Sequence, residues 1–404
     1  MKGSSGIPAL HLETLNKLIS QIDKAPSNFF TNMFKSERYP SDTINWELEY
    51  SSGGMTPFVA PGSVAPTVGI DGVSKASAKA AYWKEKMYFD EEFLNNMRQP
   101  GTSATYQTAE RQLAKGVKKL RYRCERRREW MNSQMLTKGA INYQVPGGAK
   151  VAVSYGIPDT HFVTLDASRR WTDGASRNPI EDIYEAKSVL SDDASVKPNY
   201  VMMNSELLKL LVLDEKIQAL VNKSAFGNGD LFANPDKVIA SLLGLGNMVV
   251  YDELYEVQGW LTTTPSSAVI NVDDATDFEV GGKLRFINMT KYNTWEDKTI
   301  VAVDPIASTV TVNAQPTGTF VGGRDKVIMR KKFILDNELL IFADTVDGEK
   351  IAEFMEAPYG TDRRWGFYAD SKDEWDPEGV WLRVQDKGLP VLYRPDTTYK
   401  LTVF

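Results

Sequence analysis

The spacing of apolar residues predicts a short amphipathic helix near the start of the chain. Within residues 8–24, apolar side chains recur three and four positions apart: Leu12, Leu15, Leu18, Ile19 and Ile22. Pro8 stands near the first turn and Pro26 lies just beyond the last. The apolar stripe of this helix needs a partner, either elsewhere in the chain or on another copy.

A second, much longer helix is predicted over residues 105–138. This stretch has no proline, and its apolar residues lie three, four and seven positions apart: Leu113, Val117, Leu120, Cys124, Met131 and Met135. Gly139 stands where a left-handed C-terminal cap belongs. At 1.5 Å per residue the helix would be about 50 Å long, whereas the mean globular helix has about 11–12 residues.

The remaining segments differ from one another in pattern. Residues 44–90 alternate and then break into Gly, Pro and Ser, which predicts a long hairpin with little core of its own. Helical and strand patterns alternate over 179–255 and indicate a mixed α/β domain. Strict alternation over 266–332 predicts a small all-β module inserted into that domain, and further strands follow from 333 to 404.

Composition narrows the class of protein only broadly. A chain of 404 residues with 42% hydrophobic and 25% charged residues is long enough for two or three globular domains. Its net charge of −6 argues against DNA binding by the whole surface. Cys124 is the single cysteine, which excludes an intramolecular disulfide and a cysteine-based zinc site. The pattern shows no signal peptide or membrane span, so we expect a cytosolic or virion-enclosed protein without membrane contact.

Candidate catalytic and metal-binding residues are few. His11 and His161 lie in separate contexts without a metalloprotease motif, and we expect His161 to be a surface or strand-edge residue. "VPGGAK" lacks the phosphate-loop pattern and is typical of a hairpin turn. Acidic clusters such as Asp192–Asp193 and Asp273–Asp274 match no calcium-loop spacing. We therefore expect no catalytic site, no cofactor and no metal.

The run "LRYRCERRREWMNSQMLTKGAI", residues 120–141, is the most basic part of the chain. Between residues 111 and 128, nine Lys or Arg residues stand against a single Glu. On the predicted helix they spread over the flanks beside the apolar seam, and Arg126 lies four residues before Trp130, close enough to stack. Three interpretations of these basic residues remain open. In descending order of support, they are a solvated or ion-paired helix flank, weak attraction to packaged polyanion, and specific DNA recognition.

The order of elements resembles that of tailed-bacteriophage major capsid proteins, in particular the lambda-like E family. Five stretches carry the resemblance: "MTPFVAPGSVAP", "LRYRCERRREWMNSQMLTKGAI", "YVMMNSELLKLLVLDEKI", "MVVYDELYEVQG" and the closing "LPVLYRPDTTYKLTV". The likeness covers residues 40–260 and 333–404. The module at 266–332 does not resemble any part of that family.

The resemblance implies an α+β fold of the Hong Kong 97 capsid type. Its parts would be an N-terminal arm (1–43), an extended loop (44–90), a peripheral domain (91–178) with a spine helix (105–138), an axial α/β domain (179–265), the inserted β-barrel-like module (266–332), and returning strands (333–404) that complete both domains.

The resemblance also implies a structural function. Copies would assemble as hexamers and pentamers into an icosahedral virion shell around double-stranded DNA, in the host cytoplasm. The implied partners are the chain itself, a scaffolding protein, a portal, a decoration protein, and DNA by weak non-specific contact. We expect these residues to contact neighbouring subunits: Phe58, Val59, Lys75, Lys79, Arg121, Arg126, Arg127, Arg128 and Trp130.

Two other functions are compatible with the sequence. One is a cellular nanocompartment shell of the same fold. The other is an enzyme, for example a carbohydrate-active one, with an appended β module.

Overall fold

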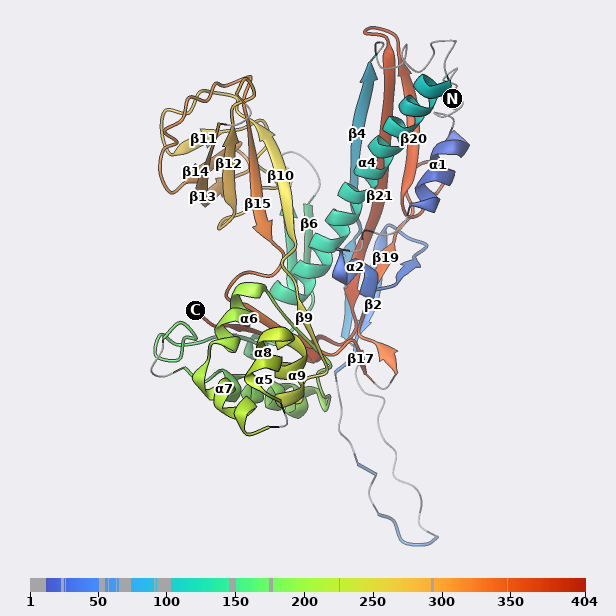
Figure 1. The fold of residues 1–404 in the computed structure, drawn as a ribbon. Helices are drawn as coiled ribbons and strands as arrows, with labels where there is room; N and C mark the ends of the chain where they lie inside the picture. The colour runs from blue at the N-terminus through green and yellow to red at the C-terminus, as the bar shows by residue number, and fades with distance from the viewer. Residues whose placement is uncertain are drawn as a thin grey trace. The chain divides into compact units, whose positions relative to one another are not determined.

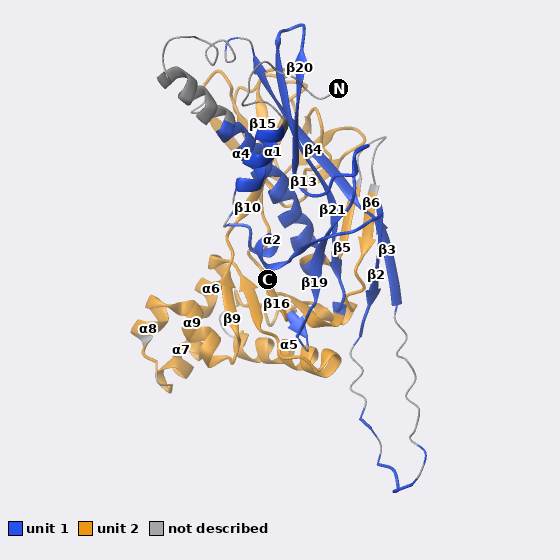
Figure 2. Cartoon of the chain, turned by 90° about the vertical axis from the view of Figure 1, so that its right-hand side faces the viewer, with its two compact units in different colours: residues 1–136, 345–395 blue, residues 137–344, 396–404 orange. Residues whose placement is uncertain are grey.

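The structure is a computed structural model of the chain. It describes residues 12–22, 25, 27–50, 55–56, 58–62, 64, 74–90, 92, 103–144, 150–173, 177–224, 226–291, 294–346 and 348–404. The chain forms two compact units, coloured in Figure 2: unit 1 is residues 1–136 and 345–395, and unit 2 is residues 137–344 and 396–404.

Unit 1 is built on a five-stranded sheet whose longest strand, β21, pairs along both edges. Gly388 of β21 pairs with Ala81 on one side and with Glu356 on the other, so β4 follows one edge while β19 and β20 share the opposite edge. The strands of this sheet are β1 (Ser36–Arg38), β4 (Ala81–Asp90), β19 (Ala352–Glu356), β20 (Tyr368–Glu374) and β21 (Gly379–Leu392).

Two helices cover one face of the sheet (Figure 1). They are α4 (Ser103–Lys138) and α1 (Leu12–Gln21), and a short helix, α2 (Phe29–Met33), follows α1. Helices and sheet share one core: Leu15, Ile19, Phe89, Val117, Leu120, Cys124, Ala369, Val380, Leu382 and Val384. Both predicted helices are thus confirmed, and the stripe of the first one is covered within its own chain.

The hairpin predicted over residues 44–90 is shorter in the structure. β2 (Thr43–Leu48) and β3 (Ser74–Lys79) pair with each other as a two-stranded hairpin. The assignment of 81–90 to this loop is wrong, because these residues form β4 and pair with β21 over their whole length. The physical reason is their alternation: Trp83, Met87 and Phe89 point to one face and pack in the core beneath α4. A small pair, β17 (Thr345–Val346) and β18 (Glu349–Lys350), completes unit 1.

Unit 2 contains the predicted mixed α/β part. Its sheet has the order β7, β22, β16, β8, β9; the outer pairs are parallel, and β16 is antiparallel to both neighbours. The strands are β7 (Phe162–Thr164), β8 (Tyr200–Met203), β9 (Asn247–Val250), β16 (Glu338–Phe342) and β22 (Thr398–Thr402). The helices are α5 (Pro179–Ala194), α6 (Ser205–Val212), α7 (Glu215–Asn222), α8 (Asn228–Ala233) and α9 (Pro235–Leu242). Trp171, Ile183, Leu207, Ile239 and Ile341 are among the residues of its core.

A two-stranded hairpin, β5 (Ala140–Gln144) with β6 (Lys150–Ser154), precedes this sheet in unit 2. The antiparallel pairing agrees with the hairpin predicted for "VPGGAK". The turn itself, residues 145–149, lies outside the described residues.

The inserted module is a closed six-stranded barrel. Its strand order is β10, β15, β12, β13, β14, β11. The two end strands meet where Leu261 bridges Val272 and the Asp273 N–H donates to the Trp260 carbonyl at 3.0 Å. The strands are β10 (Leu254–Trp260), β11 (Val269–Asn271), β12 (Lys283–Ile287), β13 (Trp295–Asp304), β14 (Thr309–Val312) and β15 (Lys326–Lys332).

The barrel begins earlier than predicted. The sequence pattern assigns residues 254–260 to the α/β domain, but β10 pairs with β15 over seven residues, so the module starts at Leu254 rather than at 266. Alternation alone indicates a strand there and does not identify its partner. The barrel interior is filled by buried side chains that include Leu284, Phe286 and Phe320.

One buried carboxylate fixes the loop before β15. Asp325 is fully buried, and its carboxylate accepts the N–H groups of Met289 at 3.0 Å and Val321 at 2.8 Å while pairing with Arg324 at 2.8 Å. The Arg324 guanidinium and these N–H donors lower the pKa of Asp325 below its ordinary value.

We predict that the contribution of Asp325 to stability depends on pH. Because its pKa is lower in the folded than in the unfolded chain, the contribution is present above the ordinary aspartate value of about 3.9 and is lost as the pH falls through the lower, folded value. Asp325→Asn should therefore destabilise the protein at neutral pH, and the gap to wild type should narrow in acid. Urea unfolding followed by tryptophan fluorescence at a series of pH values tests this, with exposed Asp166→Asn as control. A gap that stays constant down to the acid limit of the fold contradicts it.

Candidate assembly interface

The β2–β3 hairpin carries large apolar side chains that its own chain leaves in solvent. At the inner end, Ile44 and Trp46 are buried. Between the two strands, Met55, Phe58 and Val64 are 89, 103 and 92% exposed. Exposed apolar side chains gathered on one segment are typical of surfaces that bind another molecule.

The other predicted contacts of the hairpin are polar. Lys75 lies 3.8 Å from the Glu47 carboxylate across the two strands, and both side chains are more than half exposed. Such a pair contributes little to stability, on the order of 0–1 kcal/mol. Lys79 is exposed at the end of β3, and Val59 is 53% exposed. These side chains are therefore accessible to a partner.

The arginine run of α4 behaves differently, because part of it turns inward. The Arg128 side chain is 3% exposed and donates to Asp386 at 2.6 and 2.8 Å, to Glu356 at 2.9 Å and to Ser36 at 3.0 Å. Its guanidinium also lies over the ring of Phe354 at 4.5 Å. Burial by itself lowers the pKa of Arg128, but the two carboxylates outweigh burial and raise it, so the guanidinium keeps its charge.

Arg121 and the glutamates of α4 hold the N-terminal segment in place. Arg121 pairs with Glu125 at 3.0 Å and donates to the backbone carbonyl of Ile19, near the end of α1. Glu125 in turn accepts the N–H of Ala25 at 3.0 Å. Glu129, one turn further along α4, also bonds to the N-terminal segment.

Glu129 caps a helix to which it does not belong. Its carboxylate accepts the N–H groups of Phe30 at 3.0 Å and Thr31 at 2.7 Å, in the first turn of α2, and also the Thr31 hydroxyl at 2.7 Å. The residue at the N-cap position, Asn28, makes no capping hydrogen bond with its side chain. Glu129 therefore satisfies N–H groups that have no partner inside α2, and its negative charge suits the helix N-terminus.

Two residues predicted as inter-subunit contacts are engaged within their own chain. Arg128 is buried within unit 1, and the Arg121 side chain is only 11% exposed and bonded within its own chain. Arg126, Arg127 and Trp130 are half-buried, and the Arg127 guanidinium lies 5.3 Å from the centre of the Trp130 ring. Their role as contacts stays a prediction.

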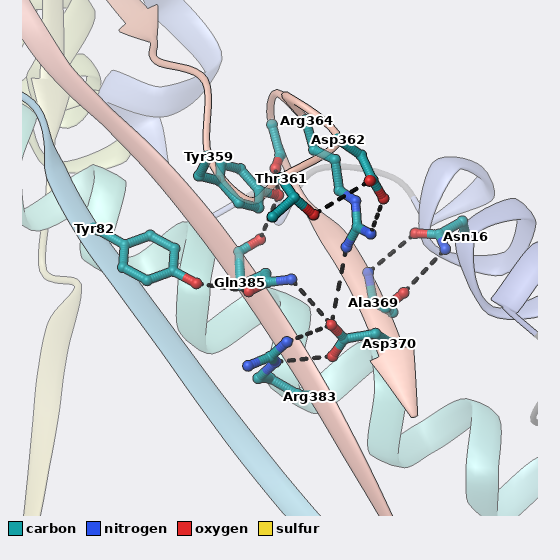
Figure 3. Close-up of polar contacts among 11 residues, drawn as sticks. Asn16, Tyr82, Tyr359, Thr361, Asp362, Arg364, Ala369, Asp370, Arg383 and Gln385 are labelled. Atoms are coloured by element: carbon teal, nitrogen blue, oxygen red, sulfur yellow. Dashed lines mark hydrogen bonds and ion pairs between the residues drawn. The ribbon is translucent and has the colours of Figure 1, made fainter. Parts of the chain in front are cut away.

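A polar network stiffens the sheet face that α4 does not cover (Figure 3). Arg383 of β21 donates to Asp370 of β20 at 2.8 Å, Gln385 donates to the same carboxylate at 3.2 Å, and Tyr82 of β4 donates to Gln385 at 2.7 Å. The contacts therefore link three adjacent strands. At the edge, the Asn16 amide of α1 exchanges two 3.0 Å hydrogen bonds with the backbone of Ala369, which joins helix and strand.

His161 is a buried residue, so its expected place at the surface or at a strand edge is wrong. It is 0% exposed, with Nδ1 2.8 Å from the Thr398 carbonyl and Nε2 2.9 Å from Asp193. Both ring nitrogens are thus engaged in joining α5 to β22. In the part of the chain that the structure describes, no group of three or more His, Cys, Asp or Glu side chains is placed to hold a metal ion. No helix there is long and apolar enough to cross a membrane.

Sequence reasoning missed Asn16, Glu129 and Asp386, each of which bonds to a residue far away in the chain. For Arg128, the sequence contains a signal that the side chain is buried. The seam Leu120, Cys124, Met131, Met135 skips one turn, and position 128 fills the gap. An arginine at a seam position indicates a buried charge whose partner lies elsewhere.

Comparison with a family model identifies the protein family of this chain. The model for phage major capsid protein E matches residues 12–293 and 317–403, which is most of the chain. This chain belongs to the phage major capsid protein E family. No curated protein sequence matches it.

The chain is similar to solved structures of phage proteins, and one of them has a TM-score above 0.5. A capsid protein of an Escherichia coli CFT073 prophage has a TM-score of 0.55 at 14% identity, over 97% of this chain and 99% of that one. A phage-related protein from Bordetella bronchiseptica RB50 has a TM-score of 0.47 at 11% identity, over 96% of each chain. The capsid of cyanophage P-SCSP1u has a TM-score of 0.47 at 10% identity, over 94% of this chain and 89% of that one. The capsid family together with the prophage structure shows the Hong Kong 97 fold.

Family membership makes this capsid-family chain a structural protein of the virion shell that assembles with copies of itself. The family match also corrects the expected range of residues that resemble the family. The module was expected to lie outside the family pattern, but the match includes residues 266–293 and 317–332 and leaves out only 294–316. The unmatched stretch contains β13 and β14, which form one hairpin of the barrel.

We predict that Arg128→Met destabilises the subunit by about 3–5 kcal/mol, because it leaves the Asp386 carboxylate buried without its partner. Arg123→Met on the same helix is the matched control. It removes a pair with Glu85 whose side chains are each 38% exposed, and this should cost about 1 kcal/mol at most. Urea unfolding of free subunits measures both variants. Equal losses of unfolding free energy in the two variants would show that the buried ion pair contributes no more to stability than the exposed one.

We also predict that Glu129→Gln loosens the N-terminal segment, because an amide accepts the α2 N–H groups more weakly than a carboxylate. The backbone amides of Phe30 and Thr31 should exchange with solvent about tenfold faster, corresponding to about 1.4 kcal/mol. Hydrogen exchange read by mass spectrometry or NMR measures this. Glu13→Gln, at an exposed position of α1, should leave these amides unchanged. Unaltered exchange in the Glu129 variant contradicts the capping role.

Proposed function

We propose that this capsid-family chain forms its shell by laying the β2–β3 hairpin of each subunit on a neighbouring copy. The exposed apolar side chains of the hairpin are the observation that carries this proposal. Their transfer out of water stabilises the assembly by about 25 cal/mol per Å² of apolar surface buried. Phe58, Val59, Lys75 and Lys79 are the contact residues of this hairpin, and Arg126, Arg127 and Trp130 form a second contact on α4.

The shell would enclose double-stranded DNA and assemble in the host cytoplasm as hexamers and pentamers. DNA contact would be weak and blind to sequence. The exposed cations that support it are Lys115, Lys118 and Lys119 of α4, whereas Arg121 and Arg128 of the same helix are engaged within the chain. A scaffolding protein, a portal and a decoration protein are the further partners. The role would rest on contacts alone, without catalysis.

We predict that Phe58→Ser prevents or strongly reduces shell formation without unfolding the subunit. The side chain is fully exposed in the free chain, so its loss should not affect the core. Truncating an interface aromatic, by contrast, commonly costs about 2 kcal/mol or more, which is on the order of 30-fold in contact affinity. Phe58→Leu keeps an apolar side chain and should assemble nearly normally. Sedimentation and electron microscopy of purified protein report shells, and circular dichroism reports folding. Normal shells from the serine variant argue against the hairpin contact.

A further inference from the structure

The turn between β20 and β21 is an acidic projection with a tryptophan in it. We call residues 373–378 the acidic knob. Trp375 is 92% exposed, and four carboxylates surround it: Asp373, Glu374, Asp376 and Glu378. Within the described part of the chain, none of these four is in an ion pair. Tyr88 of β4 bonds the carbonyls of Pro377 and Glu378 at 2.9 and 3.1 Å, which fixes the turn from the neighbouring strand.

A second surface with exposed tryptophans lies on the outside of the barrel. Strand register places four residues in one row across β10, β15, β12 and β13: Trp260, Lys326, Ile287 and Trp295. All four point outward, because their neighbours Val327 and Phe286 fill the interior. Trp260 is 48% exposed and Trp295 is 55% exposed. We call this row, together with Lys283 and Arg285, the tryptophan face.

The tryptophan face is locally basic although the chain as a whole carries a charge of −6. Arg285 is held by Asp297 through two hydrogen bonds of 2.7 Å and lies 5.4 Å from the centre of the Trp295 ring. Lys283 and Lys326 have no carboxylate within ion-pair distance among the residues described. Lys326 therefore stands in the row between the two exposed tryptophans, and Lys283 lies four residues before Ile287 on β12.

The knob and the tryptophan face are complementary in charge and in width. Trp260 and Trp295 are separated by three strand spacings, which is about 14 Å. A two-stranded turn is one strand spacing wide, about 5 Å between backbones, and so fits between the two tryptophans. Trp375 would then lie over Ile287 and Lys326, while the knob carboxylates reach Lys283 and Lys326. Aromatic anchors surrounded by matched charges are typical of energetically important contacts.

We propose that the acidic knob of one copy docks on the tryptophan face of another copy in the shell. The occupant is a second copy because the chain assembles with itself and carries both complementary surfaces. The contact deepens the proposed assembly and is separate from the β2–β3 hairpin. A polyanion such as single-stranded nucleic acid or an acidic glycan is the competing occupant, since it too would meet stacking rings and lysines.

Charge reversal tests the contact. Asp373→Lys with Glu378→Lys reverses the knob, and Lys283→Glu with Lys326→Glu reverses the face. Each pair should raise the protein concentration at which shells form by about tenfold or more, and all four changes together should bring it back near the wild-type value. Asp166→Lys with Glu349→Lys makes the same change in net charge at other exposed positions and should have little effect. Absence of rescue in the fourfold variant overturns the proposal.

Zero-length crosslinking of wild-type shells provides a second measurement if a variant fails to fold. Carbodiimide activates a carboxylate, which then forms an amide with a lysine amine while the reagent leaves as a urea. No spacer remains, so only groups in contact are joined. Shells made from mixed ¹⁵N-labelled and unlabelled subunits should give peptides joining Lys283 or Lys326 of one label to the knob of the other. Links within one label only, or none, overturn the proposal.

Two outcomes distinguish knob docking from polyanion binding and from a failure of assembly as a whole. A face reversal that abolishes binding of single-stranded DNA or an acidic polysaccharide, but leaves assembly unchanged, would identify the competing occupant and overturn the proposal. Wild-type protein that forms no shells would instead contradict the proposed function itself.

Discussion

The buried guanidinium of Arg128 is the constraint on which the arrangement of unit 1 depends. A charge taken out of water is tolerated only where carboxylates and hydrogen bonds replace its hydration, and here they come from Asp386, Glu356 and Ser36. These three residues lie on β21, on β19 and on β1, respectively. A change in how α4 lies on the sheet would leave at least one charge unpaired. The ion pair between Arg128 and Asp386 therefore fixes how α4 lies on the sheet more than it adds net stability. The cost of removing the two charges from water offsets much of their attraction.

The same helix fixes the start of the chain by equivalent means. Glu125 and Glu129 accept backbone N–H groups of the N-terminal segment, and the Asn16 amide completes the edge of β20. These bonds join residues about 100 or more positions apart. Unit 1 thus holds α4 and its N-terminal segment by hydrogen bonds and ion pairs within the chain, while Met55, Phe58 and Val64 between β2 and β3 stay in water. A subunit with an uncovered apolar segment gains further stability by meeting another copy, and a closed shell provides that contact for every copy.

The extent to which sequence predicted this structure follows from the range of each interaction. Helical periodicity is local, so Leu15, Ile19, Val117 and Leu120 identified two helices and their buried faces. Strand periodicity is also local, but it does not name the partner strand, and the pattern therefore places 81–90 and 254–260 in the wrong element. The inward turn of Arg128 depended on Asp386, 258 residues further on. Only the gap in the helix seam at position 128 pointed to it.

The barrel presents an outer surface that is separate from its buried interior. Its six strands close on themselves through Leu261 and Val272, so its interior is complete without help from the rest of unit 2. Outward positions of such a barrel are free of packing constraints, and alternation lets them differ while the inward set stays apolar. The hairpin outside the family match begins beside Trp295, at one end of the row that starts with Trp260. β13 beside β12 therefore extends the outer face by one strand and places a second tryptophan on it. A surface made in this way is suited to contacts particular to this chain, whereas α4 and its sheet provide the part of the fold that the family shares.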